Sequence, residues 1–183
     1  MHIACLGWGS LCWSSGDLPL ASNWMDDGPV LPVEYLRQSN DGRLTLVLSS
    51  TARPVRTLWA KLALPSIDHA REALRRREGI PEPGVSGIGS LPMPGGRHYA
   101  HVDNIRPWMA RRGLDGVVRT ALGPRFNDIR GEVPSLEEAL EYLRQLPASQ
   151  RKLAEEYVRR TPPSVMTLYR EAFVRELGWT SLA

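Results

Sequence analysis

The chain has 183 residues and a net charge of +3 at pH 7. Hydrophobic residues make up 42% of it and charged residues 23%, which is typical of a folded globular domain and excludes a disordered or fibrous chain. At this length we expect one domain over residues 1–183. A charge of +3 does not require a nucleic acid or an anionic membrane as partner, and we expect neither.

The N-terminal residues lack the basic lead and apolar run of a secretory signal. No stretch approaches the roughly 18 apolar residues of a membrane span. Cys5 and Cys12 do not have the spacing of a metal-binding pair, so two reduced thiols are the simplest interpretation. We therefore expect a cytoplasmic protein that is a monomer or a weak homodimer.

The first third of the chain has the pattern of short strands separated by turns. Strands are predicted over residues 2–8, 30–39, 43–50 and 56–64. Residues 9–29 are irregular, and Asn40-Asp41-Gly42 predicts a tight hairpin turn. We expect these strands to form mostly a β-meander.

A helix is predicted next, because Ser66 is a suitable N-cap and Gly79 followed by a proline is a stop signal. Its apolar stripe consists of Ile67, Ala70 and Leu74. Many glycines and prolines predict a long loop over residues 79–97. Further strands are predicted over residues 99–105 and 114–122, with a helical turn at 107–112 and a loop at 123–134.

The last third is predicted to be helical. Ser135 and Glu138 form a capping box that opens one helix, and Pro147 ends it. A second helix is expected over residues 149–160, and a third begins at residues 161–164 and ends at Gly178. Strands followed by helices indicate an α+β domain, with a helical C-terminal extension from about residue 135.

The segment over residues 6–13 is the most unusual in the chain. Gly7 and Gly9 flank Trp8 directly after a strand, and Ser10 and Leu11 follow. Glycine allows a sharp turn, and successive N–H groups in such a turn can bind an anion or a carbonyl oxygen. A simple tight turn is the alternative. A dinucleotide site is not indicated, because Cys12 stands where a third glycine is needed.

Glu78 lies four residues beyond Leu74 on the apolar stripe of the predicted helix. A carboxylate at this position is expected to be partly desolvated, which suits it to proton transfer. The alternative is a helix-end glutamate that is solvated or paired with a neighbouring arginine. Those arginines are Arg75, Arg76 and Arg77.

Other chemistry has less support in the sequence. His98 and His101 are three residues apart in a predicted strand and would point to opposite faces, so we expect no metal site and no cofactor. Ser10 is not in a G-x-S-x-G elbow. An arginine-rich helix face formed by Arg71, Arg75 and Arg76 could bind an acidic partner or RNA, or could simply be solvated.

The turn and the helix-end glutamate occur in the same order in a known family. Residues 8–13 (Trp-Gly-Ser-Leu-Cys-Trp) resemble the glycine-rich loop of the gamma-glutamylcyclotransferase-like superfamily. Residues 33–43 and 58–60 resemble its next strands, especially in the ChaC-like branch, and residues 73–78 resemble its helix ending in Arg-Glu. Residues 162–169 weakly resemble its C-terminal segment. Trp8 departs from the family's usual tyrosine.

The resemblance implies a compact mixed β-barrel with surrounding helices. It also implies an enzyme that cleaves a small γ-glutamyl compound by cyclisation to 5-oxoproline and a free amine, with Glu78 as the general acid/base and no cofactor. The substrate-binding positions that it implies are Gly7, Trp8, Gly9, Ser10, Leu11, Arg37, Ser39 and Tyr169. A non-catalytic module on the same fold that binds a small ligand or a protein is the alternative.

Overall fold

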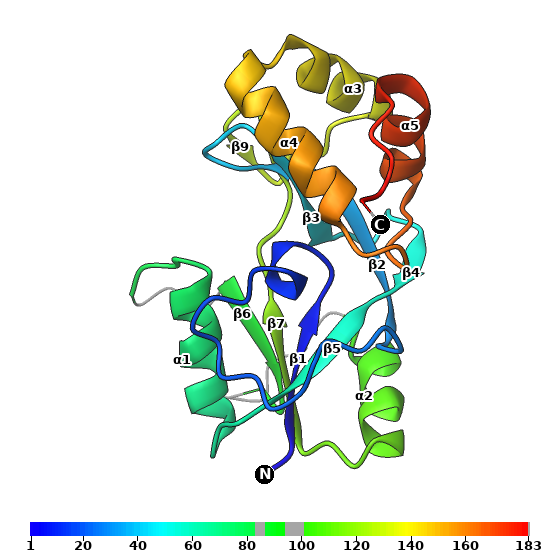
Figure 1. The fold of residues 1–183 in the computed structure, drawn as a ribbon. Helices are drawn as coiled ribbons and strands as arrows, with labels where there is room; N and C mark the ends of the chain where they lie inside the picture. The colour runs from blue at the N-terminus through cyan, green and yellow to red at the C-terminus, as the bar shows by residue number, and fades with distance from the viewer. Residues whose placement is uncertain (83–86, 94–100, 183) are drawn as a thin grey trace. The chain divides into compact units, whose positions relative to one another are not determined.

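The computed structural model describes residues 1–82, 87–93 and 101–182 (Figure 1). These residues form five α-helices and two mixed β-sheets, which confirms the expected combination of helices and strands. The chain divides into two compact units. Unit 1 consists of Met1–Gly7, Ser14–Leu31 and Arg56–Leu122, and unit 2 of Trp8–Trp13, Pro32–Val55 and Gly123–Ala183.

Unit 1 is built on a four-stranded sheet in the order β5-β1-β7-β6. Its strands are β1 (Ile3–Gly7), β5 (Leu58–Leu62), β6 (Ile88–Leu91) and β7 (Gly116–Thr120). The central strand β1 pairs antiparallel with β5 and parallel with β7. Every residue of β1 is buried, as expected for an apolar run that is covered on both faces.

The pairing of β1 corrects two expectations. The predicted meander is wrong for β1, because its partners are β5 and β7 and not the strand that follows it in the chain. Neither sheet formed by the described residues closes into a barrel, so the predicted barrel is not found in them. In unit 1 the outer edge of β5 is instead covered by irregular chain, through bridges from Leu20 and Met25.

Helix α1 (Ile67–Arg77) confirms the predicted start and stop signals. The Ser66 hydroxyl accepts a hydrogen bond from the backbone N–H of His69, and Glu78 is the C-cap residue. Gly79 follows with φ +63°, a left-handed conformation that glycine adopts at little cost. The helix packs on β6 and β7, and Ala70 and Leu74 are fully buried.

The middle of the chain differs from the prediction. Strand β6 lies inside the predicted loop over residues 79–97. Helix α2 (Val102–Arg111) replaces most of the strand predicted over 99–105, of which residues 99 and 100 lie outside the described chain. The buried face of α2 carries Ile105, Trp108 and Met109 at helical spacing. Tertiary packing of this face therefore outweighs the β-branched residues at the start of the helix.

Unit 2 holds the second sheet, in the order β3-β2-β8-β9, with β4 also paired to β2. Its strands are β2 (Val30–Gln38), β3 (Leu44–Leu48), β4 (Pro54–Arg56), β8 (Arg125–Phe126) and β9 (Ile129–Arg130). The first two residues of β2 and the last of β4 belong to unit 1. The predicted hairpin between β2 and β3 is confirmed, with Gly42 at φ +87°. Strands β8 and β9 lie in the predicted loop over residues 123–134.

The helices of unit 2 follow one another at the C-terminal end. They are α3 (Leu136–Gln145), α4 (Ala148–Arg160) and α5 (Leu168–Leu177). The capping box at Ser135 and Glu138 is confirmed. Helix α5 begins later than predicted, because the Thr167 side chain caps it, and Gly178 ends it as expected. None of the helices in the described residues is long and apolar enough to span a bilayer.

Candidate functional site

The glycine-bounded turn is held in place by the indole of Trp8. Trp8 is 4% exposed, and its Nε1 donates a hydrogen bond of 3.1 Å to the carbonyl oxygen of Leu46 on β3. The short 3₁₀ helix η1 (Ser10–Cys12) follows directly, closed by a 2.9 Å bond from the N–H of Cys12 to the carbonyl of Gly9. Leu11 is buried. The turn therefore has a fixed backbone conformation in unit 2, while Gly7 ends β1 in unit 1.

Tyr157 on α4 supports this turn, and the sequence did not point to it. A Cβ atom built on Gly9 would lie 2.3 Å from the Tyr157 hydroxyl oxygen, so any larger residue requires a shift at this position. The same oxygen accepts a 3.3 Å hydrogen bond from the backbone N–H of Leu46. The Tyr157 ring makes edge contacts with the rings of Trp13 and Tyr35. The close approach of backbone and tyrosine explains the second glycine of the motif.

Glu78 lies at the C-terminal end of α1 in unit 1. Its side chain is 15% exposed, and its Oε1 is 2.6 Å from Nη1 of Arg77. The Arg77 guanidinium also donates from Nε and Nη2 to the carbonyl oxygen of Ser14. The predicted partial desolvation is confirmed, and so is the alternative expectation of an arginine neighbour. Glu78 belongs to unit 1, and residues 8–13 of the turn belong to unit 2.

Arg37, Ser39 and Tyr169 all make contacts within the fold of unit 2. Arg37 donates to the carbonyl of Gly123, and burial together with nearby arginines lowers its pKa. The Ser39 hydroxyl bonds to Asp41 at 2.5 Å inside the hairpin turn. The Tyr169 hydroxyl donates to the carbonyl of Pro134 at 2.7 Å. These bonds give each residue a structural role, and a role at a substrate stays a prediction.

Glu34 is a buried carboxylate that the sequence did not single out. It is 3% exposed on β2, and it accepts hydrogen bonds from the Thr167 hydroxyl at 2.5 Å and the Tyr169 N–H at 3.2 Å. The carboxylate therefore accepts hydrogen bonds from donors at the N-terminus of α5. Desolvation is the main cause that raises its pKa, and these hydrogen bonds oppose the rise.

The arginine-rich face of α1 is tied up in ion pairs. Arg75 is buried, which corrects the expectation of a mostly solvated face, and its Nε lies 2.7 Å from a Glu72 oxygen. Arg76 pairs with the same carboxylate at 2.6 Å, and Arg71 lies 3.8 Å from Asp68. Paired guanidinium groups are weak determinants for an acidic partner, because a partner must displace the existing carboxylates.

Histidine and cysteine side chains form no metal centre in the part of the chain that the structure describes. His98 lies outside the described residues, and His101 directly precedes α2. Burial lowers the pKa of His101, and the charge of Arg119 adds to this effect. Cys5 is buried and Cys12 half-buried, and no disulfide bond joins them.

Comparison of the chain with protein-family models, with curated proteins and with solved structures finds no significant match. The resemblance to the gamma-glutamylcyclotransferase-like superfamily therefore rests on short sequence segments alone and stays a prediction. These segments are residues 8–13, 33–43, 58–60, 73–78 and 162–169.

Proposed function

We propose that the protein cleaves a small γ-glutamyl compound by intramolecular cyclisation, with Glu78 as the group that moves the proton. The observation that carries the proposal is the position of Glu78. A carboxylate at the C-terminal end of a helix is opposed by the helix dipole, at a cost of about 0.3–1 kcal/mol. Glu78 is the C-cap of α1 with a side chain that is 15% exposed, and the ion pair with Arg77 offsets only part of this cost. A group kept at such a cost is a candidate for chemistry.

The reaction needs few protein groups. The α-ammonium of the substrate gives one proton to the Glu78 carboxylate, and the resulting amine attacks the γ-carbonyl carbon. The new C–N bond closes the five-membered ring of 5-oxoproline, and the original amide C–N bond breaks. The Glu78 carboxylic acid then gives this proton to the nitrogen of the departing amine. The regenerated carboxylate accepts the second proton that the attacking nitrogen must lose and passes it to the amine, which leaves as its ammonium form. One carboxylate therefore serves every proton transfer, and no water is consumed.

The turn over residues 7–11 supplies the second part of the proposal. An oxyanion develops on the γ-carbonyl oxygen during attack, and fixed N–H donors stabilise such a charge. The Trp8 indole bond and the close approach of Tyr157 hold this turn in one conformation, which favours preorganised donors. Binding the substrate in a curled form also brings its amine close to the carbonyl carbon.

The test measures 5-oxoproline by mass spectrometry after incubation with a panel of γ-glutamyl amides, including glutathione. Glu78→Gln keeps the shape of the side chain but cannot carry the proton, so we expect turnover to fall by about 10²–10⁴-fold. Glu82→Gln is the matched control, because Glu82 is a nearby glutamate that is 77% exposed and also contacts an arginine. Its turnover should equal that of the unmodified protein.

Two results would contradict this assignment. Full turnover by Glu78→Gln would show that Glu78 does not carry the proton. Absence of 5-oxoproline with every substrate, together with calorimetric binding of a γ-glutamyl compound, would instead support the non-catalytic binding module. The thermal unfolding midpoint of Glu78→Gln is measured as the control for folding, because the substitution removes an unfavourable charge at the helix end and also the ion pair with Arg77.

A further inference from the structure

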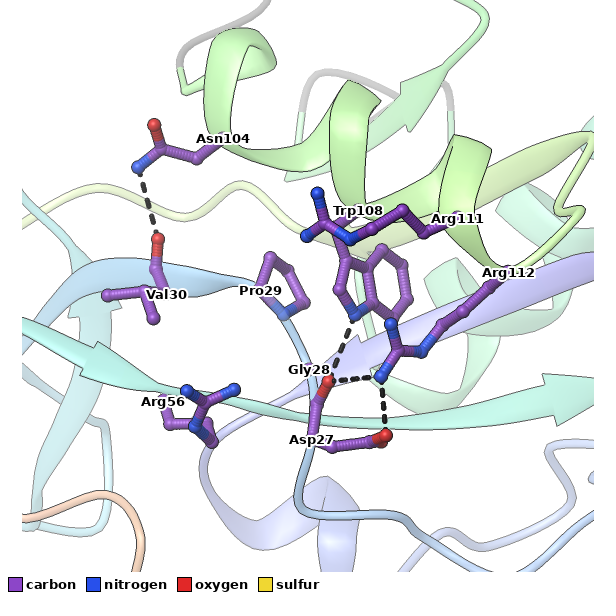
Figure 2. A pocket seen from close by; sticks show the side chains of 9 residues that line it. All are labelled: Asp27, Gly28, Pro29, Val30, Arg56, Asn104, Trp108, Arg111 and Arg112. Carbon is purple, nitrogen blue, oxygen red and sulfur yellow. Dashed lines mark hydrogen bonds and ion pairs between the residues drawn. The ribbon is translucent and has the colours of Figure 1, made fainter.

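A pocket of about 390 Å³ lies in unit 1, beside helix α2 (Figure 2). This volume falls within the roughly 300–1,000 Å³ that is typical of small-molecule sites. Neither Glu78 nor the turn over residues 7–11 contributes to it. The lining residues are Asp27, Gly28, Pro29, Val30, Arg56, Asn104, Trp108, Arg111 and Arg112.

One wall of the pocket is a rigid cluster around Asp27. The carbonyl oxygen of Asp27 accepts hydrogen bonds from Trp108 Nε1 at 3.0 Å and from Arg112 Nη2 at 2.9 Å. Its carboxylate accepts from Trp59 Nε1 at 2.7 Å and pairs with Arg112. The Arg112 guanidinium also lies over the rings of Trp59 and Trp108, 5.5 and 5.1 Å from their centroids. The charge of Arg112 is therefore balanced and its position fixed.

Two further guanidinium groups in the pocket have no such balance. Arg56 comes from β4 and Arg111 from the end of α2, and both are exposed. Across the described residues, neither side chain has a hydrogen-bond or ion-pair partner. Figure 2 shows them extending from two different elements, with Pro29 between those elements. With Asp27 offsetting Arg112, the lining carries an excess of two positive charges.

We propose that this pocket binds a small molecule through a phosphate group held by Arg56 and Arg111. A phosphate monoester carries up to two negative charges near neutral pH, which matches the excess charge of the lining. Its tetrahedral oxygens can accept from guanidinium groups on two sides, and guanidinium geometry suits such contacts. The remaining volume, bordered by Pro29 and Trp108, takes the organic part of the ligand.

The proposal can be tested by calorimetric titration with phenyl phosphate and with inorganic phosphate. We expect saturable binding with one site per chain. Arg56→Ala and Arg111→Ala should each raise Kd for phenyl phosphate by about tenfold or more, because each removes charge-assisted hydrogen bonds. Arg106→Ala is the matched control, since Arg106 is exposed on the same helix and does not line the pocket. Its Kd should stay within about twofold of the unmodified value.

Succinate and a short single-stranded RNA complete the experiment. Succinate carries the same charge in two separate carboxylates and should bind more weakly than phenyl phosphate. Equal Kd values for phenyl phosphate in the unmodified protein and all three arginine variants would overturn the proposal. Succinate binding as tight as that of phenyl phosphate would also overturn it. If only the RNA bound, and Arg106→Ala weakened this binding too, the arginines would belong to a nucleic-acid surface instead. Because both pocket arginines are exposed, the variants should unfold at the temperature of the unmodified protein.

Glu78→Gln should leave the Kd for phenyl phosphate unchanged, and this result separates the pocket from the proposed reaction.

Discussion

The contact between Gly9 and Tyr157 gives a direct test of how the turn is built. An alanine at position 9 would place its Cβ 2.3 Å from the Tyr157 hydroxyl oxygen and 3.2 Å from the ring carbon that bears it. Gly9 has φ −127°, outside the left-handed region that favours glycine, and the contact with Tyr157 is the penalty considered for Gly9→Ala. Insertion of a methyl group into a packed site costs about 1–3 kcal/mol, and we expect Gly9→Ala to fall in that range.

Tyr157→Phe removes the oxygen atom that causes the clash. On its own it leaves the buried N–H of Leu46 without the acceptor it has in the native structure, at a cost of about 1–3 kcal/mol. In the double variant the closest neighbour of the new Cβ is a ring carbon at 3.2 Å, which a small shift can accommodate. The double variant should therefore lose about 1–2 kcal/mol less free energy of unfolding than the sum of the losses of the two single variants.

The assay is urea unfolding followed by tryptophan fluorescence, with the four proteins compared under the same conditions. Gly123→Ala is the control, because a Cβ on Gly123 meets no atom within 4 Å. Its free energy of unfolding should change by no more than about 0.5 kcal/mol. Additivity of Gly9→Ala and Tyr157→Phe within about 0.5 kcal/mol would refute the claim that the hydroxyl sets the space at position 9.

Three further predictions concern titration and capping. Burial raises the pKa of Glu34 above its ordinary 4.5, so its contribution to stability is full below that pH and is lost as pH rises through the folded pKa. The free energy of unfolding of Glu34→Gln should therefore not show this decrease with pH. If the unmodified protein and Glu34→Gln lost stability in parallel from pH 4 to 7, the prediction would be contradicted. The Trp59 hydrogen bond lowers the pKa of Asp27 below 3.8, so its contribution is present above that pH and is lost as pH falls. The destabilisation caused by Asp27→Asn should therefore shrink in acid, and a constant difference in unfolding free energy would count against this. Ser135→Ala should cost about 1 kcal/mol because it removes the cap of α3, and Ser135→Thr should restore most of it; equal denaturant midpoints for Ala and Thr would exclude the cap.

Local signals in the sequence determined the ends of several elements. The hairpin at residues 40–42, the start of α1 at Ser66 and the capping box at Ser135 each depend on atoms within a few residues of one another. The partial burial of Glu78 followed from the helical period in the same way. Such features form with the same geometry in any fold, because their hydrogen bonds close within one turn of chain.

Only the tertiary structure decided which distant segments pair and which side chains meet. Strand β6, with a glycine among its four residues, has little strand propensity of its own, and its antiparallel pairing with β7 makes it a strand. Helix α2 carries strand-like residues, and burial of its face with Trp108 makes it helical. Arg56 and Arg111 are 55 positions apart, and they line one pocket because the chain from β5 to α2 folds back between them. Long-range contacts of this kind gain free energy only when both partners are in place, so no local pattern in the chain records them.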